Sequence, residues 1–126
     1  MRDLPPYAVL LGLRVEEADG RKLFVMPFGE AVLGRPGFLH GGAIAGLLEF
    51  AAYGALRDAL DDAAVRMKPV GVTVDFLRGG GARNTWAHGT IRKLGRRIAS
   101  VEAAAWQEDE ARPIAIARMN VLLARS

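Results

Sequence analysis

Residues 40–52 read HGGAIAGLLEFAA, and the only charged side chain among them is that of Glu49. The run is apolar on almost every face, so it predicts a helix over residues 41–61 that is buried rather than lying on a surface. A carboxylate buried there without a partner costs free energy. Glu49 is therefore the first candidate for chemistry. The alternatives are a structural carboxylate paired with a core arginine and a helix residue that faces solvent.

The glycines before this helix carry the second signal. No Ser, Thr, Asp or Asn lies between Phe28 and Phe50, so we expect a helix start without a side-chain N-cap. Its first N–H groups then form the positive end of the helix dipole, and Gly41 and Gly42 let a ligand approach them closely. A carboxylate together with free backbone donors is suited to attack on a carbonyl group and to stabilising the resulting oxyanion.

The rest of the chain alternates between apolar segments and turns. A short helix is expected at residues 4–12, and a loop at 29–39 leads to the long helix. The expected strands cover residues 13–18, 22–28, 70–77, 85–94, 98–107 and 113–123. Short connections make sequential strands antiparallel. One long apolar helix and these strands bury each other if the sheet curls around the helix, which predicts an α+β fold.

Composition narrows the class of protein. A chain of 126 residues, 51% hydrophobic and 25% charged, predicts one globular domain over residues 1–126. The absence of cysteine excludes disulfides and thiolate chemistry and fits a cytoplasmic location. The net charge of +3 is spread along the chain, so no nucleic-acid partner is expected. The apolar run is too short for a membrane span, and two histidines, His40 and His88, do not make a metal site.

The HGG-x6-E pattern, followed by GVTVDFLR at residues 71–78, resembles the hotdog-fold acyl-CoA thioesterases. The PaaI-like and 4-hydroxybenzoyl-CoA thioesterase groups are the most similar, over residues 4–123. The resemblance implies a hotdog fold, in which a curved antiparallel sheet wraps a long central helix. It implies hydrolysis of a small or medium acyl-CoA, aromatic ones included, to the free acid and coenzyme A. Coenzyme A would enter as part of the substrate, and no separate cofactor is expected. The chain would form a homodimer with a shared active site, or a homotetramer.

The resemblance also assigns roles to residues. Glu49 is the nucleophile or the general base, and His40 positions the loop or the substrate carbonyl. Gly41, alone or together with Gly42, supplies the N–H donor for the oxyanion. Thr73 matches a position that orients the attacking water, although it equally fits an ordinary strand residue. The phosphates of coenzyme A would be held by four arginines at strand ends and turns: Arg78, Arg83, Arg96 and Arg97. The alternative for each of them is an ordinary solvated surface residue.

Geometry adds a constraint of its own. Gly41 and Glu49 are eight residues apart on one helix, a rise of about 12 Å. Catalytic contacts are about 3 Å long, so one thioester carbonyl cannot reach both residues of the same chain. If both act, they come from different chains. The acyl group is expected to lie against apolar helix residues such as Leu48, Ala52 and Tyr53.

Two departures from the family pattern leave rival functions open. Many relatives have Asn or Gln where this chain has Gly34, and some have Ser or Thr where it has Tyr53. A hotdog domain that binds acyl-CoA without catalysis is one alternative. A hotdog enoyl-CoA hydratase or dehydratase is another, although the His-x-Pro-Gly pattern of the dehydratases is absent.

Overall fold

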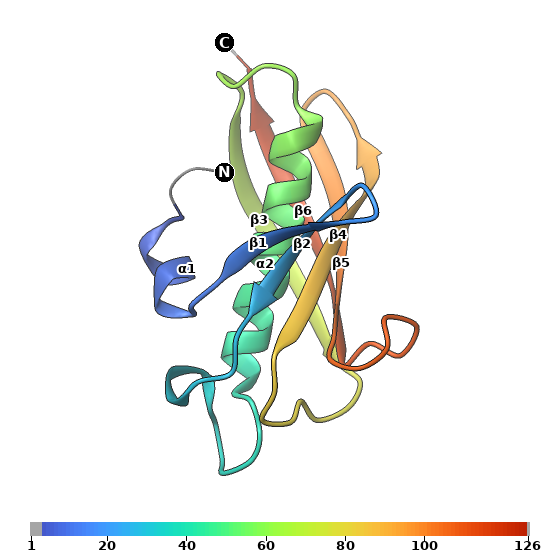
Figure 1. Ribbon diagram of the computed structural model, residues 1–126. Coiled ribbons are helices and arrows are strands. Elements are labelled where there is room, and N and C mark those ends of the chain that lie inside the picture. Colours follow the sequence, from blue (N-terminus) through green and yellow to red (C-terminus); the bar gives the residue numbers. More distant parts are fainter. Residues whose placement is uncertain (1–3, 126) are drawn as a thin grey trace.

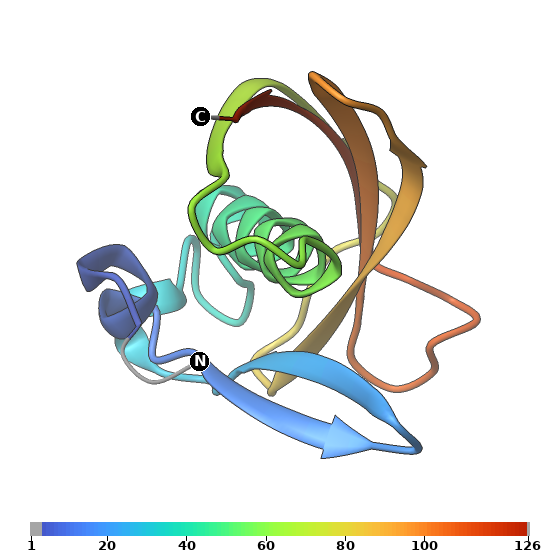
Figure 2. The same ribbon diagram turned by 90° about the horizontal axis from the view of Figure 1, so that it is seen from above.

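One long helix lies in the concave side of a curved six-stranded sheet in the computed structural model, which describes residues 4–125 (Figures 1 and 2). All neighbouring strands are antiparallel, in the order β1-β2-β4-β5-β6-β3. The predicted α+β hotdog architecture is confirmed. The elements are α1 (Pro6–Leu10), β1 (Arg14–Ala18), β2 (Arg21–Met26), the 3-10 helix η1 (Glu30–Val32), α2 (Gly41–Ala59), β3 (Arg66–Phe76), β4 (Thr85–Leu94), β5 (Ile98–Trp106) and β6 (Ala115–Ala124).

Strand β3 begins earlier than the sequence predicts, at Arg66 rather than at residue 70, and it runs through Pro69. Proline lacks an N–H group and is tolerated on edge strands and at bulges. Both conditions hold here, because β3 is the last strand of the sheet and its register with β6 shifts between Pro69 and Gly71. The predicted loop at 29–39 contains the short helix η1.

The core lies between α2 and the inner face of the sheet. Alternate residues of β6 are buried from Ala115 to Leu123, as the period of two along a strand requires. Gly89 of β4 is the point of closest approach, since a Cβ atom there would lie 2.5 Å from the carbonyl oxygen of Ala51 in α2. The absence of a side chain at this position lets the helix pack directly on the strand.

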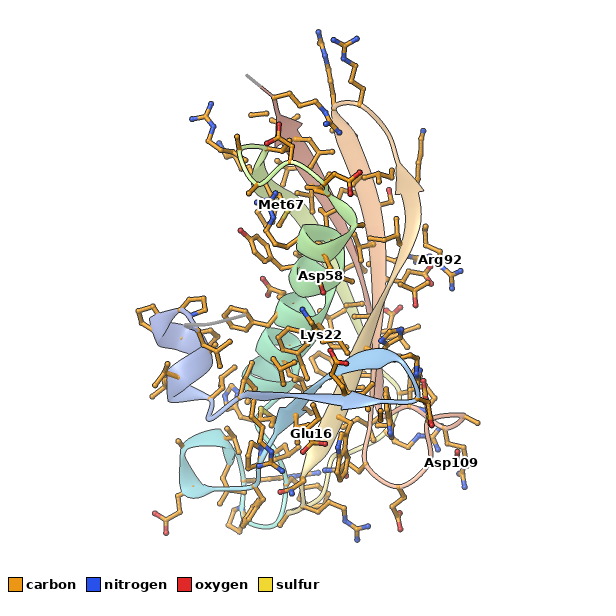
Figure 3. All side chains as sticks on the ribbon, turned by 45° about the horizontal axis from the view of Figure 1, so that its top comes forward. Glu16, Lys22, Asp58, Met67, Arg92 and Asp109 are labelled. Carbon is orange, nitrogen blue, oxygen red and sulfur yellow. The ribbon has the colours of Figure 1, made fainter. Side chains whose placement is uncertain are left out.

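The β1–β2 hairpin is fastened to the rest of the molecule by ion pairs. Arg21 donates two hydrogen bonds to Glu110, of 2.7 and 2.8 Å, across the end of the sheet. The hydrogen bond from Arg21, assisted by its charge, lowers the pKa of Glu110 against the opposing effect of burial. Lys22 pairs with Asp58 near the end of α2 (Figure 3).

Within residues 4–125, no helix is long and apolar enough to cross a membrane.

Candidate active site

The start of α2 is capped by a side chain, which the sequence analysis did not predict. His40 is the N-cap residue, and its Nδ1 atom accepts a hydrogen bond of 2.8 Å from the N–H of Gly42. The expectation of an uncapped helix is therefore wrong, because imidazole nitrogen replaces the usual hydroxyl or carboxylate oxygen. A neutral ring that accepts at Nδ1 carries its proton at Nε2. The backbone of His40 is fixed by its own N–H, which donates to the carbonyl of Val32 at 2.8 Å.

Because of this cap, the N–H groups of Gly41 and Gly42 differ in their hydrogen bonding, although the sequence alone gives no reason to distinguish them. The N–H of Gly42 is engaged with His40, so it is not the free oxyanion donor that was expected. The N–H of Ala43 donates to the carbonyl of His40 at 3.0 Å. Within the described residues, the N–H of Gly41 has no acceptor. The first turn thus presents one free donor, on Gly41, at the positive end of the helix dipole.

Glu49 is exposed in the single chain, and the expectation that its own chain buries it is wrong. The sheet covers one side of α2 and leaves the side that carries Glu49 open. That side lines a largely apolar cavity of about 470 Å³, a volume in the range of small-molecule sites. The residues around it come from α1, α2 and the inner face of the sheet: Pro5, Tyr7, Gly46, Glu49, Phe50, Tyr53, Arg57, Pro69 and Met119. We call this space the groove.

The groove has an aromatic wall. The rings of Tyr7 and Phe50 are 6.2 Å apart between centroids, and Tyr53 follows one helical turn after Glu49. Of the three predicted acyl-pocket residues, Tyr53 lines the groove. Leu48 and Ala52 do not, because they are 0% and 1% exposed and belong to the core. The sequence could not separate the two faces of so apolar a helix.

A second cavity, of about 350 Å³, lies beside the start of α2. We call it the helix-start cavity. Gly41 lines it together with the ring of Phe76, which would lie 3.4 Å from a Cβ atom at Gly41. Its remaining lining residues come from the loop before α2, from Ile44 of α2 and from the segment after β3: Arg35, Phe38, Leu39, Ile44, Leu77, Arg78, Gly79 and Gly80. The two cavities share no lining residue, so one chain keeps Gly41 and Glu49 apart, as the helical rise predicts.

Thr73 lies on the outer face of the sheet, away from α2. It is opposite Arg118 in the register of β3 and β6 and lines a cavity on that outer face with Ser100 and Asn120. Its neighbours Val72 and Val74 are opposite Met119 and Ala117, two buried core residues. The alternation of the strand therefore turns Thr73 away from Glu49 of its own chain, and the role of Thr73 in orienting water stays a prediction.

The four predicted phosphate-binding arginines do not gather at one place. Arg78 lines the helix-start cavity, and its Nε donates to the carbonyl of Pro113 at 3.1 Å. Arg83 pairs with Glu108 at 3.0 Å. Arg96 and Arg97 lie in the β4–β5 turn at the far end of the sheet (Figure 1). Within one chain, a phosphate bound beside Gly41 would therefore lie near Arg78 and far from the β4–β5 turn.

Arg35 is a candidate that the sequence analysis missed. Its guanidinium lies 4.3 Å from the centroid of the Phe38 ring, in the loop before α2, and both residues line the helix-start cavity. The signal available in the sequence was an arginine and an aromatic residue a few positions before the HGG motif. At nearby Gly34 a Cβ atom would lie 3.1 Å from the Cα of His40, a tight contact that a side chain could occupy only after a small shift of the backbone.

The remaining polar side chains do not form a second candidate site among the described residues. His88 is half-buried, and its Nδ1 is 3.2 Å from the carbonyl oxygen of Lys22. Residues 4–125 contain no group of three or more His, Cys, Asp or Glu side chains placed to hold a metal ion.

Comparison with known proteins gives one family and many structures. The family model described as thioesterase superfamily matches residues 36–114. A protein from Chromobacterium violaceum is 35% identical, with a TM-score of 0.78 over 95% of this chain and 84% of that one. A protein from Bacillus halodurans solved with coenzyme A has a TM-score of 0.88 at 21% identity, over 100% of this chain and 83% of that one. A mutant thioesterase from Pseudomonas aeruginosa is 26% identical, with a TM-score of 0.82 over 94% and 85%. A search of the curated proteins gives no match.

Proposed function

The chain belongs to the thioesterase superfamily, and on that basis we propose that it hydrolyses acyl-CoA thioesters in a site shared between two copies. One observation carries the proposal. A carboxylate, Glu49, and one free backbone donor, Gly41, lie on the same helix but open into separate cavities. Each cavity contains one of the two groups that acyl transfer requires, the carboxylate or the oxyanion donor, and a second copy of the chain supplies the other.

Strand β3 is the surface through which the second copy binds. It is an unpaired edge of the sheet, and it exposes apolar side chains, with Val70, Val72 and Phe76 39 to 56% exposed. A long apolar edge strand is prone to pair with another strand. Antiparallel pairing of β3 with its own copy is two-fold symmetric and extends the sheet from six to twelve strands.

This pairing brings the two half-sites together. The groove reaches β3 near Pro69, and the helix-start cavity reaches it at Phe76. Because the strands run in opposite directions, the Pro69 end of one copy lies beside the Phe76 end of the other. Glu49 of one chain then faces the helix start of its partner, and the partner also covers the open side of α2.

The reaction follows from these groups. The thioester oxygen accepts a hydrogen bond from the N–H of Gly41, which stabilises the negative charge that develops on it. Glu49 of the other chain either attacks the carbonyl carbon or removes a proton from a water molecule that attacks it. In either route the C–S bond breaks, and coenzyme A leaves as the thiolate and takes up a proton. When water attacks directly, the acyl group leaves as the free acid; when Glu49 attacks, the acyl group stays on Glu49 as an anhydride, which a water molecule then hydrolyses to the free acid and the carboxylate of Glu49. His40 positions Gly41 through the cap on Gly42.

Coenzyme A lies at the helix-start cavity in this proposal. Its phosphates are anions, and guanidinium groups bind phosphate with paired hydrogen bonds. Arg35 and Arg78 are the cations that line this cavity. The structural relative from Bacillus halodurans, whose structure contains coenzyme A, supports the choice of ligand class.

The test is a panel of acyl-CoAs of different length and shape, assayed by detection of free thiol. We expect the wild-type protein to release coenzyme A and Glu49→Gln to lose a hundredfold or more of the rate, on the order expected for a nucleophile or base that cannot ionise. The side chains are nearly isosteric and Glu49 is exposed, so circular dichroism of the variant should be unchanged. Binding of acyl-CoA without thiol release would identify a non-catalytic binding domain, and hydration of an enoyl-CoA would identify a hydratase.

A further inference from the structure

We infer that Arg57 selects the far end of the acyl group and that the preferred substrate is a medium-length acyl-CoA that ends in a carboxylate. The inference rests on the proposed function, because it takes Glu49 as the point at which the thioester is attacked. It concerns the opposite end of the same groove.

Three groove residues of α2 form one stripe along the helix. Glu49, Tyr53 and Arg57 follow at intervals of four residues, and all three line the groove. Each interval is a rise of about 6 Å, so Arg57 lies about 12 Å along the helix axis from Glu49. An acyl group that starts at Glu49 and lies along α2 passes the ring of Tyr53 and ends at Arg57.

Arg57 is held in place by backbone atoms. Its Nη1 donates to the carbonyl of Val65 at 3.0 Å, and its Nη2 donates to the carbonyl of Asp62 at 3.3 Å. A guanidinium has five N–H donors, so these two bonds leave donors over for a ligand. The side chain is half-buried, and these two bonds hold the guanidinium at the end of the groove.

The charge of Arg57 has no counter-ion within the part of the chain that the structure describes. Among residues 4–125, no carboxylate lies within ion-pair distance of it. Asp58, its neighbour in the sequence, pairs with Lys22. The carboxylate of Asp62 accepts a hydrogen bond of 2.9 Å from the N–H of Ala64. A half-buried cation at the end of an apolar groove favours an anionic partner. The planar guanidinium fits a carboxylate with two parallel bonds, which a hydroxyl group cannot match.

The discriminating experiment compares substrates of equal chain length. Hydrolysis of octanoyl-CoA, ω-hydroxyoctanoyl-CoA and the coenzyme A monothioester of octanedioic acid is measured with the wild-type protein, Arg57→Gln and Arg57→Lys. Arg92→Gln is the matched control, since Arg92 is an arginine of β4 that pairs with Glu102. The same three ligands are also titrated calorimetrically, so that affinity is known even where turnover is absent.

We expect the wild-type protein to prefer the carboxylate-terminated substrate by about tenfold or more in kcat/KM. Arg57→Gln should remove that preference, Arg57→Lys should restore part of it, and Arg92→Gln should leave it unchanged. A wild-type protein that hydrolyses octanoyl-CoA as well as the dicarboxylic thioester overturns the inference and leaves the proposed function standing. If no thioester is hydrolysed, the proposed function fails, and equal affinities for the three ligands would then overturn the inference as well.

Discussion

Gly41 holds the donor on which the chemistry depends, and its position allows that donor to be removed alone. Gly41→Pro deletes the N–H group, while proline is favoured at the first position of a helix. The preceding residue, His40, already has the extended backbone that a following proline requires, with φ −70° and ψ 134°. We expect Gly41→Pro to fold normally and to lose about a hundredfold in kcat.

Gly41→Ala is the matched control, because it keeps the N–H group. A Cβ atom at Gly41 would meet the ring of Phe76 at 3.4 Å, an ordinary contact. We expect kcat within a few-fold of the wild type. Equal activity of the proline and alanine variants, measured by thiol release, would remove Gly41 from the oxyanion site.

A second residue-scale prediction concerns Arg78. If it binds a phosphate of coenzyme A, Arg78→Ala raises KM more than it lowers kcat, because the contact is equally strong in the ground and transition states. A pantetheine thioester, which lacks the nucleotide, should show no such effect. Arg97→Ala, at the far end of the sheet, is the control and should leave KM unchanged. An equal rise in KM for both thioesters would show that Arg78 does not bind phosphate.

At the scale of the elements, packing of α2 on β4 depends on Gly89. Gly89→Ala would place a Cβ atom 2.5 Å from the carbonyl oxygen of Ala51, so helix and strand must move apart. We expect a loss of about 1–3 kcal/mol in the free energy of unfolding, as for other overpacked cores. Gly71→Ala is the control, since nothing lies within 4 Å of its added methyl group. Chemical denaturation of both variants measures the difference, and equal stability would contradict the close packing.

The elements also show how far the sequence predicts this molecule. The long helix, the strands and the curled sheet follow from periodicity, and β4 matches its predicted bounds, Thr85–Leu94. The start of β3 was missed because proline normally ends a strand. Whether α2 was open on one side was not predictable, since its sequence is apolar almost all round, and the exposure of Glu49 depends on which side the sheet covers.

The features of the candidate site that depend on local helix geometry could be predicted from the sequence. Those that depend on how distant segments pack could not. Eight residues on one helix were enough to separate Gly41 from Glu49. The cap by His40 was missed because histidine is not among the usual N-cap residues. Thr73 was assigned by its place in a motif, although its alternation with Val72 and Val74 already indicated the opposite face. Arg35 is a candidate site residue because the loop folds it back beside the helix start, which no spacing rule indicates.

At the scale of the whole molecule, pairing through β3 is testable without reference to catalysis. Val72→Asp places a carboxylate on the exposed edge strand, and in a symmetric dimer two such charges lie close together, which is destabilising. We expect size-exclusion chromatography with light scattering to show a folded monomer. The thiol-release assay should show that this monomer is inactive. Leu122→Asp is the control, because Leu122 and Val72 are both 39% exposed and Leu122 belongs to β6, not to the edge. A dimeric Val72→Asp protein would place the interface elsewhere.

The central claim is that each active site combines Glu49 of one chain with Gly41 of the other. It is tested most directly by mixing two inactive variants, Glu49→Gln and Gly41→Pro, carrying different affinity tags, and purifying the mixed dimers through both tags. In a mixed dimer one site has both residues intact and the other has neither. We predict that thiol release recovers to about half the activity of a wild-type dimer. Mixed dimers that are folded but inactive would contradict the claim, because a site within one chain cannot be restored by its partner.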